Sequence, residues 1–156
     1  MKAGRRRLLL ATSGALAAAA LPPAWAAGSL PAPASLASEL RSALAKGKAL
    51  VVMVSLEGCP FCKIARENYL APMRAEGQPV VQVEMKRAVP LADFAGAATT
   101  HEAFVAGLGV KVAPTVLFFG RGGKEAAPRL AGVTIPDFYG AYLQDRVDAA
   151  NRAASA

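Results

Sequence analysis

Apolar residues along the chain follow two different spacings, which predict alternating helices and strands. Residues 35–44 repeat leucine at helical spacing, whereas residues 49–54 form a continuous apolar and β-branched run. Such a run is typical of a strand that is buried on both faces. The same patterns predict, in chain order, a helix at 60–73, a strand at 79–85, a helix at 99–108, strands at 114–119 and 129–132, and a helix at 135–150.

This order of elements predicts an α/β fold. We expect a mixed central sheet of about four strands, flanked by helices, with an extra helix at the N-terminal end. The segment 88–98 has little periodicity and is predicted to be a long loop. One domain is expected at residues 35–150, after a flexible lead-in over 27–34 and before a disordered tail over 151–156.

The first 26 residues have the composition of a secretory signal peptide. Lys2 and three arginines precede an apolar run that ends near Leu21, and small residues suitable for cleavage follow at 24–26. The run is shorter than the roughly 18 residues of a membrane-spanning helix, which favours a signal peptide over a retained anchor. The paired arginines also fit the twin-arginine export route, and the sequence does not choose between the two routes. We therefore expect the protein in the periplasm.

The net charge of +7 depends partly on this leader. Four of the 18 Lys and Arg precede Ala27, so the remaining chain carries about +3, an excess too small to indicate a nucleic-acid partner. The chain has only two cysteines, Cys59 and Cys62. A disulfide across two intervening residues closes almost no loop, so it stabilises little and is better suited to redox exchange.

A zinc site is the main alternative for a Cys-x-x-Cys pair. Structural zinc needs four ligands, and besides the two cysteines the chain offers one histidine, His101, which we expect to be a solvated surface residue. We therefore predict no metal site. In the redox interpretation Cys59 precedes the helix that Pro60 opens, and the unpaired N–H groups there favour a thiolate, which makes Cys59 the attacking sulfur. Cys62, three residues on, would resolve the mixed disulfide.

A second motif lies downstream of the cysteines. Residues 109–119 place Pro114-Thr115 at the start of an apolar strand, and four residues rich in glycine follow. With the cysteine pair after a buried strand, this order resembles the thioredoxin-like superfamily from about Ala49 to Val147. The resemblance implies that Cys59 is the nucleophile and that Cys62 is the resolving thiol. It also implies a substrate groove formed by Ala113, a cis-Pro114 and Gly132.

Three features depart from the usual thioredoxin pattern. Gly58 stands where thioredoxins carry tryptophan, Met53 stands where family members often bury a carboxylate, and Pro60-Phe61 resembles glutaredoxins and periplasmic oxidases. The central dipeptide tunes the redox potential. Phe61 either lends an apolar face to the groove or packs in the helix core.

The resemblance implies a protein thiol–disulfide oxidoreductase. We expect a reductase for partner proteins, kept reduced by a membrane-bound thiol donor, with no cofactor beyond its own redox-active disulfide. Two alternatives stay open. One is a disulfide-forming oxidase of similar fold, and the other is a non-catalytic module for binding or metal delivery.

Overall fold

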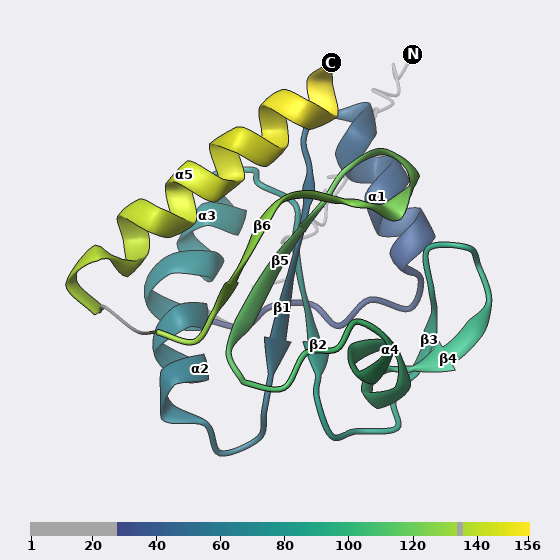
Figure 1. The fold of residues 1–156 in the computed structure, drawn as a ribbon, viewed down its shortest axis with the longest axis horizontal. Coiled ribbons are helices and arrows are strands. Elements are labelled where there is room, and N and C mark those ends of the chain that lie inside the picture. Colours follow the sequence, from purple (N-terminus) through teal and green to yellow (C-terminus); the bar gives the residue numbers. More distant parts are fainter. Residues whose placement is uncertain (1–27, 134–135) are drawn as a thin grey trace, which may run out of the picture.

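One sheet forms the centre of the molecule, with helices on both of its faces (Figure 1). The computed structural model describes residues 28–133 and 136–156, so the predicted signal peptide lies outside the described residues. The helical elements are α1 (Leu36–Ala45), α2 (Pro60–Ala65), the π-helical turn η1 (Arg66–Leu70), α3 (Ala71–Ala75), α4 (His101–Gly107), the 3-10 turn η2 (Arg121–Gly123) and α5 (Pro136–Ser155). The extra N-terminal helix expected from the sequence is α1.

The central sheet has four strands in the order β2-β1-β5-β6. β1 (Leu50–Ser55) runs parallel to β2 (Val80–Glu84) and antiparallel to β5 (Thr115–Phe119). β6 (Glu125–Ala131) pairs antiparallel with β5 through the tight turn at η2. The mixed four-stranded sheet predicted from the sequence is therefore confirmed.

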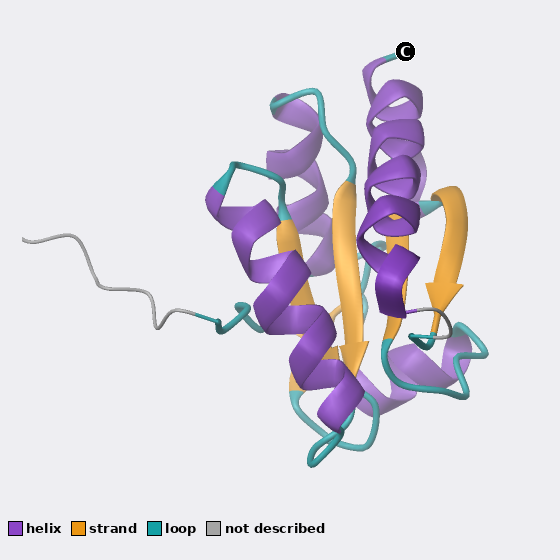
Figure 2. Ribbon diagram, turned by 90° about the vertical axis from the view of Figure 1, so that its left-hand side faces the viewer, coloured by secondary structure: helices purple, strands orange, loops and turns teal. Residues whose placement is uncertain are grey.

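The apolar run of β1 is buried because both faces of the sheet are covered. Successive side chains of a strand point to opposite faces. Val51 and Met53 pack in one apolar cluster with α5 and the end of α2, whereas Val52 and Val54 pack in a second cluster with α1 and α4. Figures 1 and 2 show the corresponding layers, with α5 and the α2–α3 helix on one side of the strands and α1 on the other.

The helix that follows the cysteine motif is irregular. It passes from α2 through the π-helical turn η1 into α3, whose second residue, Pro72, has no N–H to donate. Phe61, for which a core position was one of the two alternatives, is 52% exposed, and Ile64 one turn later is 40% exposed. Cys62 and Ala65, each one residue later and therefore about 100° further round the helix, take the core positions.

The long loop predicted over 88–98 contains a two-stranded antiparallel sheet. Its strands are β3 (Pro90–Ala92) and β4 (Ala98–Thr100), joined by a turn in which the Asp93 carboxylate accepts backbone hydrogen bonds from Ala95 and Ala97. Strands of three residues are too short to show a period of two, so the sequence pattern missed them. Phe94 in this turn packs on the rings of Phe104 and Phe119.

The lead-in predicted to be flexible over 27–34 is corrected for its described part. Residues 28–34 run past the edge of the central sheet to the small sheet. The Gln82 N–H of β2 donates to the Pro31 carbonyl at 2.9 Å, and the Ala92 N–H of β3 donates to the Ala34 carbonyl at 3.0 Å. Leu30 packs against the core. This segment therefore adds backbone pairing beyond β2, which composition alone did not indicate.

The disordered tail predicted over 151–156 is also wrong, because α5 continues to Ser155. Ala154 is buried, and the Ser155 hydroxyl donates a hydrogen bond of 2.8 Å to the Gly47 carbonyl. The sequence there lacks large apolar residues, which is why the helix was expected to end early. Alanine is nevertheless the best helix former and is small enough to pack closely.

Candidate active site

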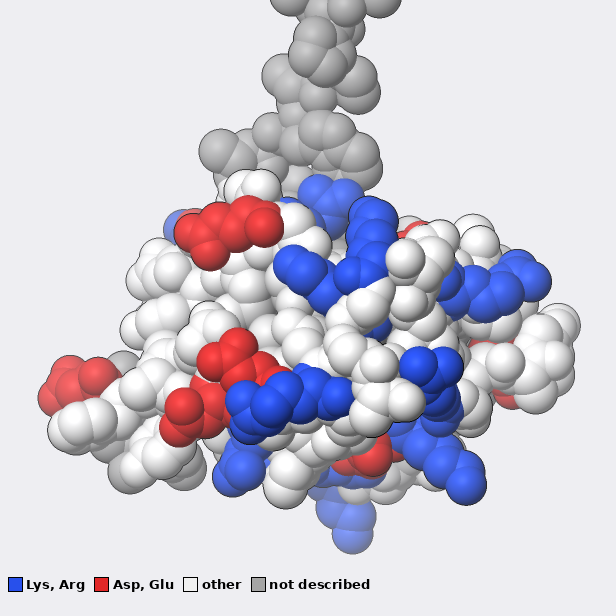
Figure 3. All heavy atoms as spheres, turned by 90° about the horizontal axis from the view of Figure 1, so that it is seen from above, with Lys and Arg blue, Asp and Glu red and all other residues white. Residues whose placement is uncertain are grey.

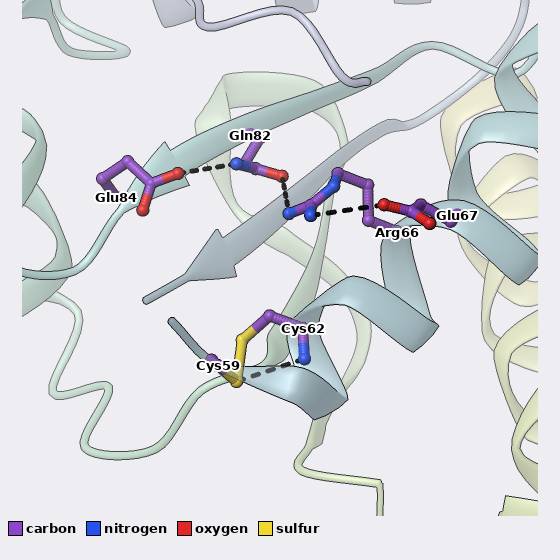
Figure 4. A network of polar contacts seen from close by, with 6 residues as sticks. All are labelled: Cys59, Cys62, Arg66, Glu67, Gln82 and Glu84. Carbon is purple, nitrogen blue, oxygen red and sulfur yellow. Dashed lines mark hydrogen bonds and ion pairs between the residues drawn. A yellow bond between two sulfur atoms is a disulfide. The ribbon is translucent and has the colours of Figure 1, made fainter. Parts of the chain in front are cut away.

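The two cysteines lie at the carboxyl end of β1, where the chain turns into α2. Gly58 immediately precedes them with φ of +73°, a conformation that other residues rarely adopt. The turn therefore gives a backbone reason for glycine at this position. Cys59 and Cys62 form a disulfide, with their Cα atoms 5.2 Å apart (Figure 4).

Cys59 is the N-cap residue of α2, as the sequence predicted. Its sulfur accepts a hydrogen bond of 3.1 Å from the Cys62 backbone N–H, one of the donors that a helix start leaves without an intrahelical partner. Pro60 occupies the first helical turn, where a missing N–H costs nothing. Cys59 is partly exposed, whereas Cys62 is only 1% exposed. Of the two cysteines, Cys59 is therefore the one that is exposed to a partner molecule.

The segment before β5 lies against Cys59. The Cys59 sulfur is 3.8 Å from the Ala113 carbonyl oxygen, and the Ala113–Pro114 peptide bond is cis. The Thr115 hydroxyl donates to the Val112 carbonyl at 2.8 Å and fixes this turn. The structure thus brings Ala113 and Pro114, 54 and 55 residues after Cys59 in the chain, to the cysteine pair.

The third predicted groove residue, Gly132, joins the same region. Its N–H donates a hydrogen bond of 2.7 Å to the Pro114 carbonyl. Phe61 and Val112 are each about half exposed, which excludes the core position considered for Phe61. Apolar surface is therefore available on both segments that contribute to the cysteine site.

A cavity of about 450 Å³ opens on another side of Cys59 and is not bordered by Ala113. Its wall combines the turn after β1, the start of α2 and the end of β2, and it carries three cationic and two acidic side chains. The lining residues are Ser55, Leu56, Glu57, Gly58, Cys59, Pro60, Lys63, Arg66, Glu84 and Arg87. Sequence reasoning missed Arg66, Glu84 and Arg87. Glu84 and Arg87 come to Cys59 because β2 pairs in parallel with β1, whereas Arg66 lies on the helix that follows Cys59.

A chain of polar contacts runs along this wall above the disulfide (Figure 4). The Gln82 amide donates to the Glu84 carboxylate at 2.6 Å and accepts from the Arg66 guanidinium at 3.4 Å. Arg66 also lies 3.8 Å from the Glu67 carboxylate. Gln82 pairs in register with Met53, the residue that stands where thioredoxins often bury a carboxylate. Polar groups at this place in the sheet therefore come from β2 and η1 rather than from β1.

His101 is not the solvated surface residue that the sequence suggested. It is 1% exposed, and its Nδ1 accepts a hydrogen bond of 3.1 Å from the Glu84 backbone N–H. Its position in the first turn of α4 was read correctly, but α4 packs this turn against β2. Burial lowers the pKa of His101 from its ordinary value of 6.5, against the opposing effects of the Glu84 carboxylate and the Pro33 carbonyl.

We expect the buried imidazole to make stability depend on pH. Because its folded-state pKa lies below 6.5, the unfolded chain binds this proton more readily, so the free energy of unfolding falls as pH drops below about 6.5. Urea unfolding at pH 7.5 and pH 5.5 measures the difference. His101→Asn, which retains an acceptor for the Glu84 N–H, should show a smaller drop, and an equal drop in both proteins would contradict the assignment.

Within residues 28–133 and 136–156 no helix is long and apolar enough to cross a membrane. No group of three or more His, Cys, Asp or Glu side chains in them is placed to hold a metal ion. Figure 3 shows the end of the molecule where the C-terminus lies, and there Lys and Arg side chains occur in separate groups with Asp and Glu between them.

A cysteine pair at the start of a helix, beside a mixed sheet of this order, defines the class of thiol–disulfide exchange proteins. The chain belongs to the thioredoxin-like domain family, whose sequence model matches residues 36–146. No curated protein sequence matches the chain.

Solved structures agree with this family assignment at the level of the fold. A thioredoxin-fold protein from Helicobacter pylori superposes with a TM-score of 0.53 at 17% identity, over 69% of this chain and 73% of its own. A thioredoxin from Thermus thermophilus superposes with a TM-score of 0.51 at 17% identity, over 75% of this chain and 87% of its own. At 17% identity these superpositions establish the thioredoxin fold and nothing about the chemistry of the site.

Proposed function

We propose that this protein is a periplasmic thiol–disulfide oxidoreductase that reduces disulfides in partner proteins. One observation carries the proposal: the partly exposed Cys59 sulfur caps α2 and is already bonded to the buried Cys62. The helix N–H groups around that sulfur stabilise negative charge, so the reduced form presents a reactive thiolate to the outside.

The exchange proceeds in two steps from the reduced protein. The Cys59 thiolate attacks one sulfur of a partner disulfide, which forms a mixed disulfide and releases the other partner sulfur as a thiolate that takes up a proton. Cys62, after losing its proton, attacks the Cys59 sulfur. This step releases the second partner thiolate and leaves the Cys59–Cys62 disulfide. Two electrons have then passed from the protein to the partner.

The segment at Ala113 and Pro114 is the proposed docking site for the partner chain. It lies against the Cys59 sulfur and is held by Thr115 and Gly132. An extended partner segment would add its backbone hydrogen bonds here, as in other cases of strand addition. The half-exposed Phe61 and Val112 would supply apolar contacts beside the reacting sulfurs.

Each cycle leaves the protein oxidised, so a thiol donor has to reduce it again. We propose a membrane-bound dithiol partner, because the periplasm is kept oxidising and the leader predicts export. The disulfide itself carries the electrons, so no bound cofactor is required. The connection from β2 to β5 holds only the β3–β4 pair and the seven-residue α4. The described chain thus lacks the large helical insertion of the main periplasmic oxidases, which supports the reductive direction.

The equilibrium redox potential against glutathione tests this direction. We expect a value near about −270 mV, as for a thioredoxin-type reductant, together with turnover of insulin disulfides in the presence of dithiothreitol. A potential near about −120 mV would identify the oxidase alternative. No turnover with either a reductant or an oxidant would instead support the non-catalytic binding or metal-delivery module.

A further inference from the structure

The cavity beside Cys59 has a charge pattern that the exchange chemistry does not use. Lys63, Arg66 and Arg87 line it together with Glu57 and Glu84. Since Cys59 borders both this cavity and the Ala113 segment, a partner chain bonded to Cys59 has to place residues next to its cysteine close to the cavity.

The charged groups of the wall are not equally available. The Glu84 carboxylate accepts a hydrogen bond from Gln82, and Arg66 is held by Gln82 and Glu67 (Figure 4). Lys63 and Arg87 are exposed, and neither makes an ion pair with any residue in the described part of the chain. Of the two carboxylates that line the cavity, Glu57 is the exposed one.

We propose that this cavity selects protein partners that carry an acidic side chain next to the reactive cysteine. The carboxylate would enter between Lys63 and Arg87, where it meets two cations that have no competing ion pair. The cavity volume is ample for one Asp or Glu side chain, and its position against Cys59 couples recognition to formation of the mixed disulfide. This inference rests on the proposed function and adds a substrate preference to it.

Matched peptide disulfides that differ in one residue test the preference. Three peptides would carry Glu, Gln or Lys next to the reactive disulfide, and kcat/KM would be measured for each at low ionic strength. For the wild-type protein we expect the Glu peptide to react roughly two- to fivefold faster than the Gln peptide, and the Lys peptide to react more slowly than both.

The preference should depend on the two cavity cations. In the variant Lys63→Gln with Arg87→Gln, the ratio of Glu-peptide to Gln-peptide rates should fall to about one, and high salt should have a similar effect on the wild type. Lys86→Gln is the matched control, because Lys86 is exposed and adjacent to Arg87 in the chain but does not line the cavity. It should keep the wild-type ratio.

The ratio separates substrate preference from thiol reactivity, because a changed Cys59 thiolate affects the Glu and Gln peptides equally. An unchanged ratio in the double variant, or the same loss in Lys86→Gln, would overturn the cavity assignment while leaving exchange itself intact. Failure of the wild-type protein to reduce even the Gln peptide would instead refute the proposed function, and the inference with it.

Discussion

Replacing Cys62 by Ser should abolish turnover and trap the protein on its substrates through Cys59. The Cys59 sulfur keeps its position as the cap of α2 and remains partly exposed, so the first attack proceeds. The step that releases the partner is lost, because it needs the Cys62 sulfur. Incubation of the reduced variant with insulin, followed by mass spectrometry under non-reducing conditions, should show a covalent complex that reductant removes.

The complementary variant, Cys59→Ser, should lose turnover equally but form no such complex. Its remaining cysteine, Cys62, is 1% exposed and lies on the core side of α2, where a partner sulfur cannot approach in line. Equal trapping by both variants would show that the roles of the two cysteines are not divided as proposed. A complex through Cys62 alone would reverse them.

The features predicted from sequence were those encoded by neighbouring residues. The buried run of β1 places the cysteine motif at the end of a strand, and Pro60 marks the start of the next helix. Pro114 could be associated with the cysteines only through the resemblance to a known fold. No local pattern connects residues more than 50 positions apart, and the antiparallel pairing of β5 with β1 supplies that link.

Other site features required the tertiary arrangement. Arg66, Glu84 and Arg87 look like ordinary surface charges in the sequence, since the sequence does not show how the helix after Cys59 and the end of β2 lie relative to each other. Placing the end of β2 next to the end of β1 brings them to one cavity. His101 was misjudged for the same reason: a polar residue in the first turn of a short helix is commonly exposed, but here it faces the β2 backbone.

The C-terminal helix shows how a small polar contact can matter more than composition suggests. Asn151 accepts a hydrogen bond of 2.9 Å from the Ala49 backbone N–H, just before β1, and its amide donates to Gln78 at 2.9 Å. Gln78 is buried and donates in turn to the Ala49 carbonyl at 2.8 Å. These contacts connect the end of α5 to the starts of the two parallel strands.

Replacing Asn151 by Ala should therefore lower the free energy of unfolding by about 2–3 kcal/mol, because the Ala49 N–H and the Gln78 side-chain Oε1 would lose their partners in a buried place. Urea denaturation should show a lower midpoint with an unchanged slope. Gln144→Ala on the same helix is the matched control, since Gln144 is exposed and its side-chain amide donates to Asp148 on the same helix, and it should change stability by about 0.5 kcal/mol or less. Equal stability of Asn151→Ala and the wild type would mean that the Asn151 contacts do not hold α5 to the sheet.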